Sequence, residues 1–160
     1  MKGDANVIKH MNAILTNELS ATNQYFLHAR ILKNWGILIL ADKIYEESIG
    51  EMKHADLLIE RILMLDGLPN LQDLHSLKVG ESVEEMFTAD MALEKKNQAD
   101  LKEAIKAAEQ AADYVSRDML IKILSETEEH IDWIEAQQDL VRMAGIQNYI
   151  QERIGRIDDE

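Results

Sequence analysis

The residues of this chain best suited to chemistry begin with Glu51 and His54, three positions apart in a segment of helical composition. On a helix this spacing places both side chains on one face, so a carboxylate and an imidazole can bind the same metal ion. A single pair of this kind arises by chance in any Glu-rich helix. Its meaning therefore depends on whether other segments bring similar groups to the same place.

Further ionisable residues fall on apolar stripes, where burying an unpaired charge is costly. Glu18 lies in the stripe of the first predicted helix, Glu94 in that of the third and His130 in that of the fourth. A simpler alternative is that the glutamates reach water at the stripe edges and the histidines are hydrogen-bonded core residues. We predict instead that four helices direct five metal ligands towards one axis: Glu18, Glu51, His54, Glu94 and His130.

Helices must position these groups, and the composition favours helices, with one proline and seven glycines in 160 residues. Hydrophobic periodicity predicts long helices along the stripe from Val7 to Ala29 and over about Leu38 to Asp66, Ser82 to Asp113 and Tyr114 to Ala144, then a short fifth over Ile146 to Ile154. Ser82 and Glu85 form a capping box after a long ordered crossover that starts at Gly67. Short, long and short connections predict an all-α four-helix bundle whose second and third helices run parallel.

Charge and length limit the other functions open to the chain. Its 160 residues fit one domain, residues 1–160. Thirty acidic against 17 basic residues give a net charge of −13, which disfavours nucleic acid and anionic membranes as partners and attracts metal cations. The chain has no cysteine, no leader-like start and no apolar run long enough to span a bilayer. These features predict a cytoplasmic protein with a solvated acidic tail, Asp158 to Glu160.

Several segments resemble those of bacterioferritins, and the resemblance covers essentially the full length without gaps. It implies a ferritin-like four-helix bundle, a single ferritin-like domain over residues 1–160. The segments that carry it are MKGD at the start, Asn17 to Leu19, Asn23 to Arg30, Asn34 to Gly36, Glu51 to Asp56, Gly67 to Leu74, Tyr114 to Asp118 and His130 to Trp133.

The resemblance also implies a function, namely iron storage and detoxification. Family members form a hollow shell of 24 subunits that takes up Fe(II), oxidises it with oxygen at a di-iron centre inside each subunit and stores a ferric mineral. The matching residues here give Glu18 and Glu94 as terminal ligands, Glu51 as the bridge, and His54 and His130 each on one iron. An electron-donating partner of the ferredoxin type is implied for iron release.

A haem is implied as well. In the family, haem b lies between two subunits and is bound by the same methionine from each, and the matching residue here is Met52. Because Met52 follows Glu51, it points about 100° away around the helix, towards the outside of the bundle.

The chain departs from the family pattern at the oxidation centre. The fourth helix lacks the usual Glu-x-x-His, since Thr127 stands three residues before His130 and a neutral hydroxyl replaces a carboxylate ligand. Glu126 would need a long reach or a helix distortion to replace it. In the second helix, Glu46 and Gly50 replace a histidine and an aspartate that the family associates with iron near the inner cavity.

Three functions stay open at this point. The first is an iron-storing ferroxidase, whose centre Thr127 impairs in part. The second is a structural haem-bearing subunit, lacking full ferroxidase activity, that co-assembles with a complete bacterioferritin subunit. The third is a di-iron oxygenase or a peroxide-reducing enzyme, since one bundle can serve several chemistries. His10, His28 and His75 are expected at exposed or interface positions without a metal.

Overall fold

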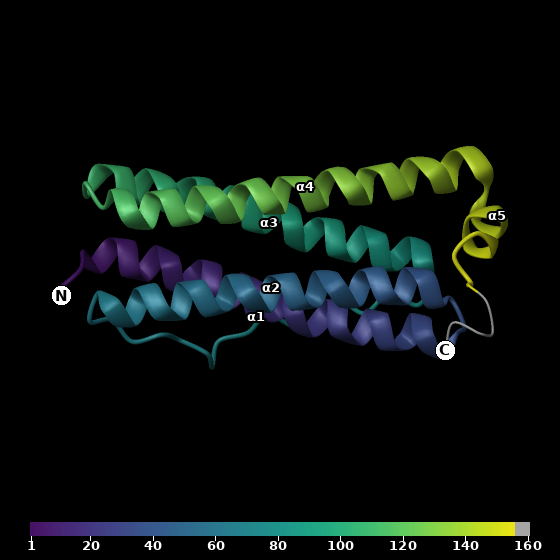
Figure 1. Ribbon diagram of the computed structural model, residues 1–160, viewed down its shortest axis with the longest axis horizontal. Helices are drawn as coiled ribbons and strands as arrows, with labels where there is room; N and C mark the ends of the chain where they lie inside the picture. Colours follow the sequence, from purple (N-terminus) through teal and green to yellow (C-terminus); the bar gives the residue numbers. More distant parts are fainter. Residues whose placement is uncertain (156–160) are drawn as a thin grey trace.

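The computed structural model describes residues 1–155, and all the regular structure in this part of the chain is helical (Figure 1). The predicted all-α bundle with a short C-terminal helix is confirmed. No helix within residues 1–155 is long and apolar enough to cross a membrane. The fifth helix stops three residues earlier than predicted, and the acidic tail from Asp158 lies outside the described residues. The helices are α1 (Ala5–Asn34), α2 (Leu38–Met64), α3 (Val83–Gln110), α4 (Tyr114–Ala144) and α5 (Ile146–Gln151).

The long helices form two antiparallel hairpins, α1 with α2 and α3 with α4 (Figure 1). The crossover after α2 runs back along the bundle, so α2 and α3 point in the same direction, as the connection lengths predict. Helix α1 packs on α3, whereas α2 and α4 approach each other least closely of the neighbouring pairs. The bundle is therefore most open between α2 and α4.

Polar side chains and left-handed residues set the helix ends. Asp4 caps α1 by accepting a hydrogen bond from the Val7 amide, and Ser82 caps α3 by accepting from the Glu85 amide, which confirms the first half of the capping box. The Glu85 carboxylate accepts from the amide of Glu81, not of Ser82. Helix α2 ends because Asp66 adopts a left-handed conformation with φ 59°.

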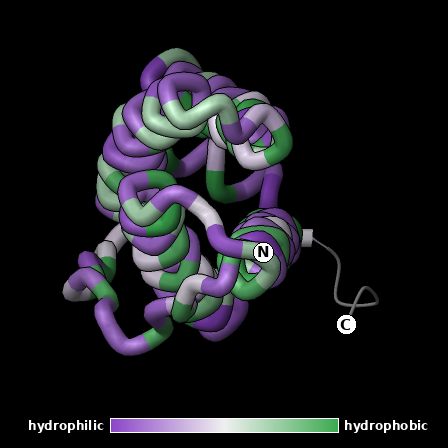
Figure 2. The backbone as a smooth tube through the Cα atoms, turned by 90° about the vertical axis from the view of Figure 1, so that its left-hand side faces the viewer, coloured by the Kyte–Doolittle hydropathy of each residue, from purple (hydrophilic) through white to green (hydrophobic). Residues whose placement is uncertain are grey.

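The core consists of two apolar clusters at opposite ends of the bundle. Figure 2 shows hydrophobic and hydrophilic residues alternating around each helix, as an amphipathic bundle requires. The predicted stripes of α1 and α2 are buried. In α3, Glu94 is buried as predicted, whereas the neighbouring Leu93 is only partly buried. One cluster includes Met11, Ile14, Leu58, Ile62, Leu101 and Leu120; the other includes Tyr25, Leu32, Leu40, Ile44, Phe87 and Tyr149.

Buried side chains of α1 hold the crossover in place. The amides of His75, Lys78 and Gly80 donate hydrogen bonds to Ser20, Gln24 and His28 respectively. His28 is fully buried, so the expectation that it lies at an exposed or interface position was wrong. Its Nε2 accepts the bond from Gly80, and its Nδ1 lies 2.9 Å from the buried carboxylate of Asp90 on α3. The crossover is thus an ordered strap across α1, as predicted.

Candidate metal centre

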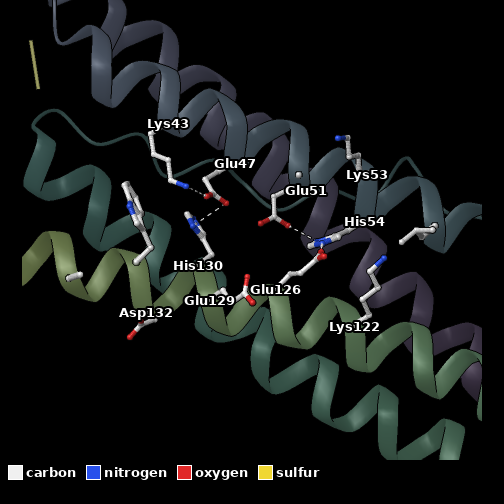
Figure 3. Close-up of a pocket in the computed structure, with 14 residues that line it drawn as sticks. Lys43, Glu47, Glu51, Lys53, His54, Lys122, Glu126, Glu129, His130 and Asp132 are labelled. Atoms are coloured by element: carbon white, nitrogen blue, oxygen red, sulfur yellow. Dashed lines mark hydrogen bonds and ion pairs between the residues drawn. The ribbon is translucent and has the colours of Figure 1, made fainter. Parts of the chain in front are cut away.

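A belt of polar residues separates the two apolar clusters at the middle of the bundle. It contains all five residues singled out in the sequence, and each is at least nine-tenths buried: Glu18 at 0%, Glu51 at 3%, His54 at 7%, Glu94 at 1% and His130 at 5% exposure. They come from four helices, and Figure 3 shows Glu51, His54 and His130 directed into the space between α2 and α4. Buried ionisable groups of this kind need compensation from each other, from protons or from a cation.

Three of the five form a compact group. One ligand atom each from Glu18, Glu51 and His54 lies within 4.8 Å of the others. His54 Nδ1 is 3.4 Å from Glu18 Oε2 and 3.4 Å from Glu51 Oε2. Glu18 comes from α1 and the other two from adjacent turns of α2, as their three-residue spacing predicts. Among residues 1–155 this is the one histidine and carboxylate group compact enough to hold an ion as it stands.

Glu94 and His130 interact electrostatically with Glu51 of this group, and Thr127 is buried three residues before His130 on α4. Four buried atoms of the belt make no hydrogen bond: Glu51 Oε2, Glu94 Oε2, Thr127 Oγ1 and His130 Nδ1. Buried polar atoms are nearly always satisfied, so several unsatisfied ones in one belt indicate a missing partner. Carboxylate oxygens and imidazole nitrogens suit divalent first-row metals, and the residues present therefore fit such an ion.

Neighbouring residues orient the carboxylates. Asn97 Nδ2 donates a 2.8 Å hydrogen bond to Glu18 Oε1, which leaves Oε2 towards His54. The Tyr25 hydroxyl donates to Glu94 Oε1. Sequence reasoning missed both, although a signal exists: Tyr25 is seven residues after Glu18, and Asn97 three after Glu94, so each pair shares a helix face.

Glu126 reaches His54 without any break in α4. Its carboxylate contacts His54 Nε2 and not the region of Thr127. A bond from Nε2–H to Glu126 leaves the lone pair of Nδ1 directed towards Glu18 and Glu51. Metal-binding histidines are commonly oriented by a carboxylate in this way.

Glu47 lies close to the second histidine. Its Oε2 lies 3.1 Å from His130 Nδ1, and its Oε1 lies 3.0 Å from Lys43 Nζ (Figure 3). Glu47 was not recognised from the sequence. It lies one turn before Glu51 on α2, a spacing that places both on one face of the helix.

Burial and mutual repulsion shift the proton equilibria of the site. Burial raises the pKa of Glu51 to about 8, and the Glu18 carboxylate adds to that rise. The pKa of Glu94 is raised by burial and then by Glu51. Burial alone would lower the pKa of His54, but its contacts with Glu18 and Glu51 outweigh burial and raise the pKa to about 11. Without a cation the site therefore holds protons, which a divalent ion would displace.

A cleft of about 740 Å³ leads from the surface between α2 and α4 to Glu51, His54 and His130. Gly50 lines it, and a Cβ placed there meets no atom within 4 Å. Met52, one residue from Glu51, is 51% exposed and points out of the bundle, as its position on the helix predicts. Glu46 is exposed as well.

Comparison with known proteins defines the class of this fold and site. The model of the Ferritin family, a ferritin-like domain, matches residues 8–144. The bacterioferritin of Mycobacterium leprae (strain TN) is 42% identical over 156 residues, 98% of this chain and 98% of the relative. That of Brucella melitensis biotype 1 is 44% identical over 149 residues, 93% and 92% of the two chains. A bacterial ferritin of Synechocystis sp. is 43% identical over 155 residues, 96% and 99% of the two chains.

The fold and the buried carboxylate and histidine belt are thus those of a ferritin-like protein. Within that class, the chain belongs to the bacterioferritin family. The predicted resemblance is confirmed.

Proposed function

We propose that this chain stores iron, as a subunit that binds Fe(II) at the buried centre, oxidises it with dioxygen and passes Fe(III) to a mineral. In this proposal residues 1–160 act as one domain in a cytoplasmic shell of 24 subunits. The observation that carries the proposal is the set of ligand atoms of Glu18, Glu51 and His54, which lie within 4.8 Å of one another in a belt that also holds unsatisfied buried atoms of Glu94, Thr127 and His130. The names of the relatives support the choice of iron.

The residues of the belt have distinct roles in this proposal. Glu18 and His54 bind the first ion, Glu94 and His130 bind the second, and Glu51 lies between the two positions. The two Fe(II) together supply two electrons, which with two protons reduce one dioxygen to hydrogen peroxide. Asn97 and Glu126 hold Glu18 and His54 in their binding orientations, and the two flanking apolar clusters keep bulk water away from the ends of the site.

Haem b and two kinds of partner belong to the same proposal. Met52 would bind haem together with the same methionine of a second copy, and its half-exposed thioether on the outside of α2 is free to do so. A ferredoxin-type partner would then supply electrons for iron release. The test is haem loading of Met52→Leu beside Met64→Leu, a second exposed methionine of α2. Loss of the haem absorbance band in the first variant alone is expected, and equal haem content in both would contradict the assignment.

A second function is favoured by one observation, the buried and unsatisfied hydroxyl of Thr127. A neutral ligand at this position binds the second ion less strongly than a carboxylate would. The chain would then be a structural, haem-bearing subunit that stores iron oxidised by a complete bacterioferritin subunit in a mixed shell.

Aerobic oxidation of Fe(II) by the assembled protein, followed by ferric absorbance beside a Thr127→Glu variant, separates the two functions. The ferroxidase proposal expects a rapid phase stoichiometric with the sites in the natural protein and little gain in the variant. A rapid phase in the variant alone would favour the structural subunit. A lack of rapid oxidation in both proteins would refute the ferroxidase proposal.

A further inference from the structure

Glu47 is a carboxylate at the second metal position that the family pattern does not assign. It extends from the same face of α2 as Glu51 and lies in the cleft between α2 and α4. Its Oε2 is 3.1 Å from His130 Nδ1, yet Nδ1 makes no hydrogen bond. The two groups are therefore close without being hydrogen-bonded to each other.

Their separation is the one expected of two ligands on the same ion. Two atoms bound at about 2.1 Å to one ion lie about 3.0 Å apart at a right angle and about 3.4 Å apart at a tetrahedral angle. The Glu47 Oε2 to His130 Nδ1 distance of 3.1 Å falls in this range. The 3.4 Å distances from His54 Nδ1 to Glu18 and Glu51 fall in it too.

From this geometry we propose that Glu47 supplies the carboxylate ligand of the ion held by His130, in place of the carboxylate that α4 lacks at Thr127. The inference rests on the proposed function and specifies its second metal position. Three nine-tenths buried residues of the belt have side-chain atoms without a hydrogen-bond partner: Glu94, Thr127 and His130.

The charge of Glu47 suits the role. Its carboxylate lies beside Lys43 as well as His130 and would supply the negative charge that threonine cannot. Lys43 holds Oε1, so one oxygen of the carboxylate remains for an ion.

Glu126, the other carboxylate able to compensate, is already engaged elsewhere. It contacts His54 Nε2, on the side of that ring away from Glu18 and Glu51, and its side chain is 45% exposed. The Glu47 side chain is 21% exposed and faces the second histidine. The contacts thus divide the two carboxylates between the two histidines, Glu126 as a positioning residue and Glu47 as a ligand.

The test is Co(II) binding to the assembled, metal-free protein, followed by calorimetry and by the visible absorbance of the bound ion. Four proteins are compared: the natural chain, Glu47→Gln, Glu46→Gln as an exposed neighbouring control, and the double variant Glu47→Gln with Thr127→Glu. Circular dichroism and particle size show that each variant folds and assembles.

We expect two Co(II) per subunit in the natural chain and in Glu46→Gln. Glu47→Gln should keep the first ion at unchanged affinity and bind the second at least tenfold more weakly, and Thr127→Glu should restore that second affinity. The inference is overturned if Glu47→Gln binds both ions as the natural chain does, if the natural chain binds one ion only, or if the double variant stays as weak as Glu47→Gln. Absence of Co(II) binding in every protein would refute the proposed function itself, and so the two failures are distinguishable.

Discussion

Replacing Asn97 with leucine removes the hydrogen bond that holds Glu18 in its binding orientation and keeps a side chain of similar size. In the natural chain the amide donates at 2.8 Å to Glu18 Oε1, and both residues are buried. Asn17, which donates to Asn97, keeps a second acceptor in Asp100. The substitution therefore leaves Glu18 Oε1 as the one newly unsatisfied buried atom.

Two costs follow from that loss. An unsatisfied buried acceptor costs about 1–3 kcal/mol, which the metal-free protein loses from its free energy of unfolding. Without Asn97, the Glu18 side chain must also be immobilised when the ion binds. This immobilisation, together with a poorer alignment of the carboxylate on the ion, costs about 1–2 kcal/mol of binding free energy. The dissociation constant of the first ion should then rise about 5- to 30-fold.

Calorimetric titration of the metal-free assembly with Co(II) measures this change. The matched control is Gln98→Leu, which removes an amide that bonds the exposed carboxylate of Glu128 and leaves the site intact. Thermal denaturation of both variants at equal protein concentration gives the stability difference. If Asn97→Leu binds the first ion within twofold of the control, Asn97 does not orient Glu18 and the reasoning fails.

Three further results are expected. Tyr25→Phe leaves Glu94 without its donor, so the free energy of unfolding of the metal-free protein should fall by about 1–3 kcal/mol, and added Zn(II) should remove most of the difference in thermal denaturation. An effect unchanged by Zn(II) would contradict a role at the site. The folded-state pKa of Glu51 is raised to about 8. Its favourable contribution to the free energy of unfolding is therefore complete below about pH 4.5 and is lost as the pH rises through 8. The free energy of unfolding of the metal-free protein should therefore fall over that pH range, and saturation with Zn(II) should reduce this pH dependence. A metal-free stability that rises towards pH 8 would refute the argument. Gly67→Ala places a Cβ 2.9 Å from methyl groups of Ile62 and Ile8 and should cost about 1–3 kcal/mol, whereas Gly50→Ala meets no atom within 4 Å and should be stabilising; equal melting temperatures would contradict this packing.

The sequence predicted the fold well because the signals for it are local. Helical periodicity, the Ser82 cap and the long segment after Gly67 give the number, order and direction of the helices. The errors concern helix ends, since α2 ends at Met64 rather than at about Asp66 and α5 at Gln151 rather than Ile154.

Part of the candidate site could also be predicted from local signals in the sequence. Charged residues on apolar stripes stand out in a sequence, and five such residues indeed meet in one belt. Contacts between helices are not visible in this way. Glu47 and Glu126 look like ordinary surface glutamates until α2 and α4 are brought together, and only then does each face a histidine of the opposite helix. His28 was misplaced likewise, because its partners Gly80 and Asp90 are distant in sequence.

The strap that the crossover forms across α1 also bears on how the chain folds. The α1 and α2 hairpin is synthesised first, but Ser20, Gln24 and His28 of α1 find their partners only in residues 75–80 and in Asp90. Until those residues emerge, the hairpin must expose these groups to water or bury them at a cost. These unpaired groups would lower the stability of the first half on its own, and we expect the bundle to gain its structure cooperatively once α3 has been made.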